Sequence, residues 1–94
     1  MIIIISYDII NSSKRNRIVR ILREYGTRVQ KSVFECDVSE KDRLDIFSRL
    51  SQVMESLEEV KDSIRFYKVC EKCLSQTRII GTGKIEERPE YIII

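Results

Sequence analysis

The start of the chain constrains the fold most strongly, because four isoleucines and a tyrosine fall within the single short run Ile2–Asp8. A β-branched and aromatic run that polar, turn-forming residues follow is typical of a strand. Side chains of a strand alternate between its two faces, so this strand is apolar on both. We therefore expect both faces to be buried. Helices of the same chain can cover one face, and a partner subunit is the simplest cover for the other.

Helix and strand signals alternate along the rest of the chain. Helices are expected over about Ser12–Tyr25 and from Ser39 onward. Arg28–Val38 is expected to form one bent strand or two short ones, and further strands are expected over Ser63–Cys70 and Thr77–Ile80. The buried stripe of the second helix is expected to comprise Leu44, Phe47, Leu50, Met54 and Leu57. This order predicts an α/β (α+β) fold, and a ferredoxin-like split β-α-β sandwich if the Arg28–Val38 segment supplies two strands.

The length of 94 residues predicts a single domain, residues 1–94, with a C-terminal tail or strand over residues 84–94. A lone domain of this size is marginally stable, so association would help it. The tail carries the apolar run Tyr91–Ile94, which we expect to pack as a strand on the partner of a homodimer. Folding back onto its own sheet is the alternative.

Two absences narrow the chemistry and the compartment. The isoleucine run is far too short to span a membrane, and no basic start or cleavage site indicates a signal peptide. We therefore expect a cytoplasmic protein that binds no membrane and whose three cysteines are reduced thiols. The sequence has no histidine, so any chemistry runs through carboxylates, a metal, cysteine or tyrosine.

Basic residues concentrate in one segment of the chain. Between Lys14 and Lys31 there are seven bases and one acid, Glu24, whereas Glu35–Asp62 holds nine acids and four bases. A basic segment of this kind either meets phosphate or forms an ordinary solvated helix face.

The first three of these bases lie where they oppose the helix dipole. Lys14, Arg15 and Arg17 fall in the first turns of the expected helix, where positive charge is mildly unfavourable. Exposed helix amides beside basic side chains form an anion site, which favours phosphate binding here. Solvent-exposed side chains with no ligand are the alternative.

Asp8 is the first candidate for chemistry, since it closes the first strand just before a loop, and α/β sheets often carry sites there. An aspartate can hold Mg²⁺, which needs only one or two protein carboxylates and keeps its waters. A two-fold dimer would bring two copies together. The alternative role is a helix cap or a turn residue that accepts hydrogen bonds from backbone amides.

Phe34 and the cysteines have less specific signals. Phe34 is a candidate base-stacking platform, although a strand phenylalanine is by default a core residue. Cys70 and Cys73 form a CxxC, which is half of a zinc site, and Cys36 adds only a third sulfur. A dimer would pool two pairs. A redox role of the thioredoxin kind is a further alternative, but there the motif opens a helix after a strand in a βαβ setting. Two inert thiols at a strand end are the default interpretation.

Four segments, in their order and spacing, resemble the small CRISPR-associated adaptation proteins of the "Cas two" family. They are Ile2–Ile9 with its terminal aspartate, Lys14–Arg17, Tyr25–Glu35 and Asp62–Tyr67. The third contains Gln30-Lys31-Ser32-Val33-Phe34-Glu35, which is similar to the family's Gln-x-Ser-Val-Phe-Glu. The residues after the fourth segment fall where the family is variable.

The resemblance implies a ferredoxin-like homodimer that acts in spacer acquisition, clamped between two dimers of the CRISPR integrase. It also implies a metal-dependent endonuclease (endoribonuclease) on single-stranded RNA or double-stranded DNA. Asp8 would be the catalytic residue and would hold Mg²⁺ or another divalent cation. The nucleic-acid-binding residues implied by the resemblance or by the basic segment are Arg15, Arg17, Arg28, Phe34, Lys14 and Arg20.

Three functions remain open from the sequence. The first is a nuclease, in which a divalent cation on two Asp8 side chains polarises a phosphate and activates a water. The second is a non-catalytic scaffold that grips the DNA backbone and bridges integrase dimers. One candidate carboxylate per chain is a small number of catalytic residues for a nuclease, which supports the scaffold. The third is a ferredoxin-like ribonuclease or RNA-binding module with no link to CRISPR.

Overall fold

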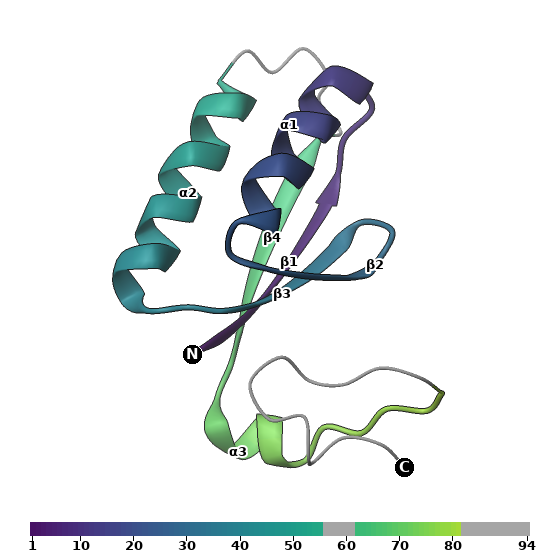
Figure 1. The fold of residues 1–94 in the computed structure, drawn as a ribbon, viewed down its shortest axis with the longest axis vertical. Coiled ribbons are helices and arrows are strands. Elements are labelled where there is room, and N and C mark those ends of the chain that lie inside the picture. Colours follow the sequence, from purple (N-terminus) through teal and green to yellow (C-terminus); the bar gives the residue numbers. More distant parts are fainter. Residues whose placement is uncertain (56–61, 82–94) are drawn as a thin grey trace.

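We analysed a computed structural model of the chain, which describes residues 1–55 and 62–81. Four strands and three helices follow one another along these residues (Figure 1). The strands are β1 (Ile2–Asp8), β2 (Gly26–Gln30), β3 (Val33–Asp37) and β4 (Ser63–Val69). The helices are α1 (Ser12–Arg23), α2 (Glu40–Met54) and the single turn α3 (Glu71–Ser75).

The four strands form one antiparallel sheet in the order β2-β3-β1-β4, which places β1 at its centre. The segment 28–38 lies within a hairpin of two strands, β2 and β3, so the two-strand alternative is the one that the structure adopts. The resulting order β-α-β-β-α-β is that of the ferredoxin-like split sandwich. The expected fold class is therefore confirmed at the level of an α+β fold with a four-stranded antiparallel sheet.

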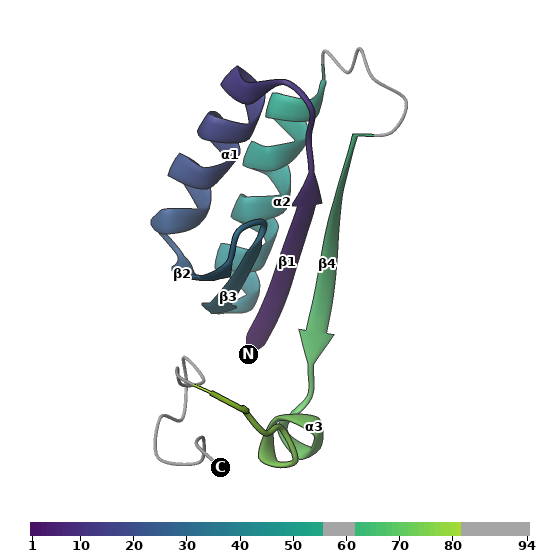
Figure 2. The same cartoon turned by 90° about the vertical axis from the view of Figure 1, so that its right-hand side faces the viewer.

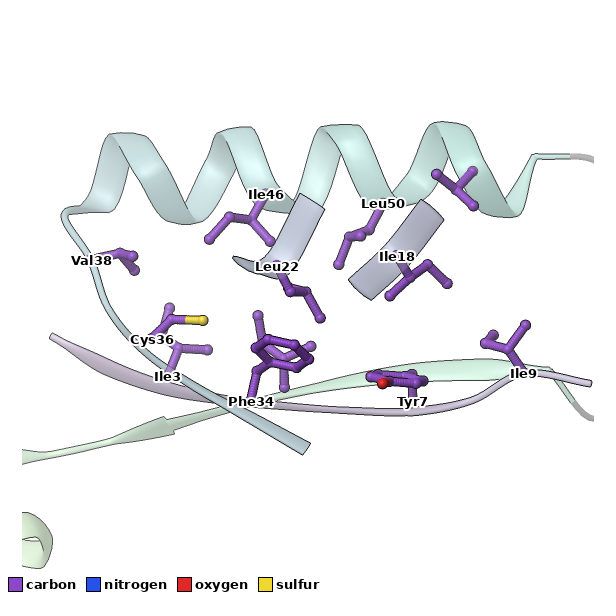
Figure 3. Packing of buried hydrophobic residues seen from close by; sticks show 12 residues of the cluster. Ile3, Tyr7, Ile9, Ile18, Leu22, Phe34, Cys36, Val38, Ile46 and Leu50 are labelled. Carbon is purple, nitrogen blue, oxygen red and sulfur yellow. The ribbon is translucent and has the colours of Figure 1, made fainter. Parts of the chain in front are cut away.

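The alternation of β1 sends every second side chain into the core (Figure 3). Ile3, Ile5 and Tyr7 lie on the face that the helices cover, and each is at least 95% buried because its exposed fraction is 5% or less. Phe34 of β3 lies beside them, with its ring centroid 6.5 Å from that of Tyr7. Full burial of one such apolar side chain contributes about 1.5–3 kcal/mol, so this face holds the fold together.

Both long helices lie on that one face of the sheet, as Figure 2 shows. Helix α1 buries Ile18 and Leu22, as the sequence pattern indicates. Helix α2 instead buries Ile46, Leu50 and Val53.

The buried stripe predicted for α2 is therefore wrong in part. The helix is rotated about its axis, so that Ile46 and Val53 are buried in place of Leu44 and Phe47. Leu44 and Phe47 are 54% and 56% exposed. Phe47 still contacts an aromatic partner, since its ring centroid lies 5.6 Å from that of Phe66 on β4. Leu57 lies outside the described residues.

Among residues 1–55 and 62–81, the second face of β1 is covered only at one end, and α3 and its neighbours supply that cover. Ile2 packs with Leu74 of α3 in a small separate cluster, to which Val69 and Ile79 contribute. The sequence pattern did not predict α3. The strand expected over 77–80 does not form, because these residues have only a single bridge residue at Ile79 and a bend at Ile80. The tail over 84–94, with its run 91–94, lies outside the described residues, so its packing on a partner remains a prediction.

Replacing Gly26 by alanine should destabilise the protein, because β2 and β3 approach closely at this position. An added Cβ would overlap the carbonyl oxygen of Glu35 and lie 2.5 Å from the Sγ atom of Cys36. Forced shifts of this kind typically cost about 1–3 kcal/mol. Urea unfolding measures the loss, and Val29→Ala, an exposed change on the same strand, is the control. Equal free energies of unfolding for Gly26→Ala and wild type would contradict this packing.

Candidate nucleic-acid interface and carboxylate pocket

Asp8 is the last residue of β1 and its side chain is exposed. Its register partner across the sheet is Ser63 of β4. Because side chains alternate along a strand, Asp8 shares its face with Ile4 and Ser6, opposite the helices. The carboxylate therefore stands on the open face of the sheet, where a second chain has access to it.

A polar pocket of about 410 Å³ surrounds this carboxylate. Strand β1 lines it with Ser6, Tyr7 and Asp8, and the other lining residues are Ser32, Ser63, Arg65 and Tyr67. Arginine is charged at any physiological pH, so Arg65 adds a permanent positive charge to the pocket. A hydrogen bond to the side chain of Tyr67 raises the pKa of Arg65 further. The pocket thus combines one anion, one cation and several hydroxyl groups, which suits a hydrated cation or a phosphate oxygen.

The oxygen atoms that line the pocket are of the kind that coordinates Mg²⁺, but few of them belong to carboxylates. Carboxylate and hydroxyl oxygens are hard ligands of the kind that Mg²⁺ prefers, and one or two carboxylates suffice when waters complete the shell. Of the described residues, Asp8 is the only carboxylate that lines the pocket. Within residues 1–55 and 62–81, no cluster of three or more acidic, cysteine or histidine side chains forms a metal-ligand group. One chain thus meets the minimum requirement for Mg²⁺ through Asp8 and its neighbouring hydroxyl groups.

A second hollow, also of about 410 Å³, lies between α1 and β2 and is strongly basic. We call it the arginine groove. Among the described residues, four of the six that line it are arginines and none is acidic: Arg15, Asn16, Val19, Arg20, Arg23 and Arg28. Guanidinium groups match phosphate geometry with paired N–H donors, so this lining is suited to a nucleic-acid backbone.

Arg15 connects the arginine groove to the loop that follows Asp8. Its Nη1 atom donates hydrogen bonds to the carbonyl oxygens of Ile9, at 3.1 Å, and Ile10, at 3.4 Å. A guanidinium has five N–H donors, so the others remain available to a ligand.

Arg28 makes the corresponding connection on the other side. Its Nε and Nη2 atoms donate to the carbonyl oxygen of Lys31, at 3.0 and 2.5 Å. The hydroxyl group of Tyr7 donates to the same oxygen at 3.0 Å. The turn between β2 and β3 is thereby fixed both to the groove and to the strand that carries Asp8.

Asp62 is a positioning residue that sequence reasoning did not single out. It is 7% exposed, and its Oδ1 atom accepts a hydrogen bond from the backbone N–H of Ile10 at 3.1 Å. Two hydrogen bonds therefore hold the loop that follows Asp8. Asp62 accepts one from this loop, and Arg15 donates the other to it. The only sequence signal was its position at the start of the segment Asp62–Tyr67.

The single acid of the basic segment is paired from the neighbouring helix. Arg49 of α2 donates to both carboxylate oxygens of Glu24, at 3.0 and 2.9 Å. It also donates to the hydroxyl group of Tyr25 at 3.1 Å. Hydrogen bonds from Arg49 hold the pKa of Glu24 below its usual value. Because Arg49 forms an ion pair with Glu24, the negative charge of Glu24 is offset by a residue of α2 instead of by the arginines of the groove.

The structure separates the six predicted nucleic-acid-binding residues into three groups. Arg15, Arg20 and Arg28 line the arginine groove together. Arg17 and Lys14 belong to α1 but do not line it, and Arg17 is exposed.

The prediction for Phe34 requires a correction. Its side chain is 0% exposed and packs in the core between sheet and helices. A base can stack only on an exposed ring face, so Phe34 is a packing residue here, as the default interpretation of a strand phenylalanine had it.

Removing the charge of Glu24 should lower stability in a pH-dependent way. The folded-state pKa of Glu24 is depressed, so its contribution is present above the ordinary value of 4.5 and is lost as the pH falls through the folded pKa. Glu24→Gln should therefore be less stable than wild type at neutral pH and should approach it in acid. Urea unfolding across this range measures the difference, with the exposed change Glu55→Gln as control. A constant difference at all pH values would contradict the pairing.

Comparison with known proteins identifies the family. The family model described as CRISPR associated protein Cas2 matches residues 1–77. A protein of Chloroflexus aurantiacus named CRISPR-associated endoribonuclease Cas2 1 is 38% identical over 96 residues, which cover 100% of this chain and 99% of the relative.

Two solved structures share the fold. The crystal structure of Streptococcus pyogenes Cas2 has 34% identity and a TM-score of 0.65, covering 86% of this chain and 100% of that one. A chain of a partial Cas6-RT-Cas1–Cas2 complex has 28% identity and a TM-score of 0.72, covering 84% and 89%. Fold, family model and sequence identity agree over nearly the whole described chain, and the protein belongs to the CRISPR-associated Cas2 family.

Proposed function

We propose that this protein acts in CRISPR spacer acquisition, where it binds the phosphate backbone of nucleic acid and bridges integrase dimers. It would also cleave single-stranded RNA or double-stranded DNA, with Asp8 holding the divalent cation. The observation that carries the proposal is the arginine groove, in which four arginines meet and no acid lines the wall. The protein would act in the cytoplasm as a homodimer. Among the described residues, none of the helices has the length and apolar character that crossing a bilayer requires.

Backbone binding follows from the chemistry of the groove. Phosphates are the repeating anions of a duplex, and side chains that neutralise them release condensed counterions. Arginines on one helix and one strand contact phosphates without reading base edges, so the binding would be independent of sequence. The pairing of Glu24 with Arg49 supports this role. Glu24 is the single acid of the basic segment, and its negative charge is offset by Arg49 instead of by the arginines of the groove.

A catalytic role would use the pocket around Asp8. Asp8 would hold Mg²⁺ with waters, and the cation would polarise a phosphate and activate a water. Asp8 stands on the open face of the sheet, so a partner packed on that face would bring a second Asp8 toward the first. Arg65, in the same pocket, would neutralise the phosphate that is cleaved.

A non-catalytic scaffold is the second candidate, and one observation favours it. Asp8 is the sole carboxylate lining its pocket, and no cluster of metal-binding side chains occurs in the part of the chain that is described. The likeness to a chain from a Cas1–Cas2 complex supports a partner of the integrase kind for either function. In the scaffold, the groove would carry DNA and Asp8 would have no chemical role.

Replacing Asp8 by asparagine should abolish cleavage and leave nucleic-acid binding intact. The amide has no negative charge to hold a divalent cation, whereas the groove arginines are unchanged. The measurement is cleavage of labelled single-stranded RNA and duplex DNA with Mg²⁺ and with EDTA. Asp45→Asn, an exposed aspartate on α2, provides the same change in charge away from the pocket.

The two variants together discriminate between the functions. Metal-dependent cleavage by wild type and Asp45→Asn, but not by Asp8→Asn, would support the nuclease. Cleavage that persists in Asp8→Asn would refute the metal assignment. Duplex binding with no cleavage by any of the three proteins would make the scaffold the function.

Replacing Arg20 and Arg23 together by glutamine should weaken duplex binding and flatten its salt dependence. Each phosphate contact contributes about 0.9 to the slope of log K against log salt concentration, so the slope should shrink by roughly 2. Fluorescence anisotropy at several salt concentrations measures it. Lys41→Gln with Lys68→Gln removes two exposed charges outside the groove and should leave the slope unchanged. Equal slopes for the two double variants would contradict phosphate binding in the arginine groove.

A further inference from the structure

The CxxC segment is the feature that the proposed function does not use. The default interpretation of Cys70 and Cys73 was a pair of inert thiols at a strand end. Cys70 directly follows the end of β4 and caps α3, and Cys73 lies within that helix. A helix that opens after a strand is one part of the setting in which CxxC pairs are redox-active, although no further strand follows α3 in the described residues to complete a βαβ unit.

The two thiols are exposed and are held on one helical turn. The backbone N–H of Cys73 donates a hydrogen bond to the Sγ atom of Cys70 at 3.3 Å. The backbone N–H of Leu74 donates to the carbonyl oxygen of Cys70 at 2.8 Å, and the side chain of Leu74 is buried against Ile2. Cys70 is the N-cap and Cys73 the third residue of α3, and the Cys73 side chain also hydrogen-bonds the Cys70 side chain, so the two sulfurs already lie near each other.

We propose that Cys70 and Cys73 form an exposed vicinal dithiol that reduces small-molecule disulfides and closes to an internal disulfide, with Cys70 as the attacking thiol. This proposal is independent of the nucleic-acid function. The thiolate of Cys70 attacks one sulfur of a disulfide RSSR, forms a mixed disulfide and releases RS⁻. Cys73 then loses its proton and attacks the Cys70 sulfur, which releases the second RS⁻. Two electrons pass from the protein sulfurs to RSSR, and both RS⁻ ions take up protons.

The electrostatics assign the two roles. Hydrogen bonds to Sγ from Cys73, the first of them from its backbone N–H, lower the pKa of Cys70. Its thiolate is therefore present at a lower pH than that of an ordinary cysteine. The hydrogen bond between the two side chains raises the pKa of the Cys73 thiol, which keeps that thiol protonated until the mixed disulfide forms.

A metal site fits these residues less well than a disulfide does. A structural zinc site needs four ligands, and the described residues contain no group of three cysteine, histidine or acidic side chains. The remaining cysteine, Cys36, is fully buried in the core. A disulfide needs only the two thiols that one chain already brings together.

The test is the reaction of reduced full-length protein with glutathione disulfide, followed by acid quenching, alkylation and intact mass spectrometry. Wild type should lose two hydrogens and retain no glutathione. Cys73→Ser should stop at a stable adduct with one glutathione on Cys70. Cys70→Ser should form its adduct several-fold more slowly, because Cys73 has the higher pKa. Serine at position 70 keeps a side-chain acceptor for the capping hydrogen bond, and circular dichroism checks that both variants are folded.

Three results would overturn the proposal. The first is a stable glutathione adduct on wild type in place of the internal disulfide. The second is equal reaction rates for the two serine variants. The third is zinc that co-purifies at one ion per two chains and is lost in both variants, which would show that the cysteines are metal ligands shared by a dimer. Cys36 serves as an internal control, since it should be alkylated only after unfolding.

Discussion

The burial of alternate side chains of β1 beneath two helices is the constraint on which the rest of the structure depends. Ile3, Ile5 and Tyr7 face the helices, and this fixes β1 at the centre of the sheet between β3 and β4. A strand cannot shift its register by one residue without moving that apolar set to the opposite face. The same alternation therefore holds Asp8 on the open face, so the packing of the core determines where the carboxylate stands.

The core also connects the carboxylate pocket with the arginine groove. Tyr7 packs in the core, yet its hydroxyl group shares the Lys31 carbonyl oxygen with Arg28. Arg15 and Asp62 hold the loop that follows Asp8. Arg15 thus lines the groove and also bonds the loop after Asp8, while Arg28 lines the groove and bonds the turn that Tyr7 holds.

Local patterns predicted most of the fold, and the exceptions have physical causes. The two-faced strand, the positions of the two long helices, and the α+β arrangement all depend on patterns that are visible in the sequence. The stripe of α2 was misread because Leu44 and Phe47 fit a helical period as well as Ile46 and Val53 do. Only the angle at which the helix meets the sheet decides between them. Helix α3 is too short to have a period, and the burial of Leu74 against Ile2 maintains it.

The candidate site was predictable in composition but not in arrangement. The excess of arginine in one segment was visible, and the structure adds that Arg15, Arg20 and Arg28 converge while Arg17 does not. Pairing between Glu24 and Arg49 joins residues 25 positions apart, which no local pattern reveals. Asp62 likewise acts over 52 positions through a backbone N–H group.

The claim that the arginine groove receives the nucleic-acid backbone is tested most directly by nuclear magnetic resonance of ¹⁵N-labelled protein titrated with a short DNA duplex. The account predicts saturable shifts of the backbone amides along the groove face of α1 and around Arg28, which diminish as salt is added. Shifts confined to α2, which does not line the groove, or no saturable shift anywhere, would contradict it.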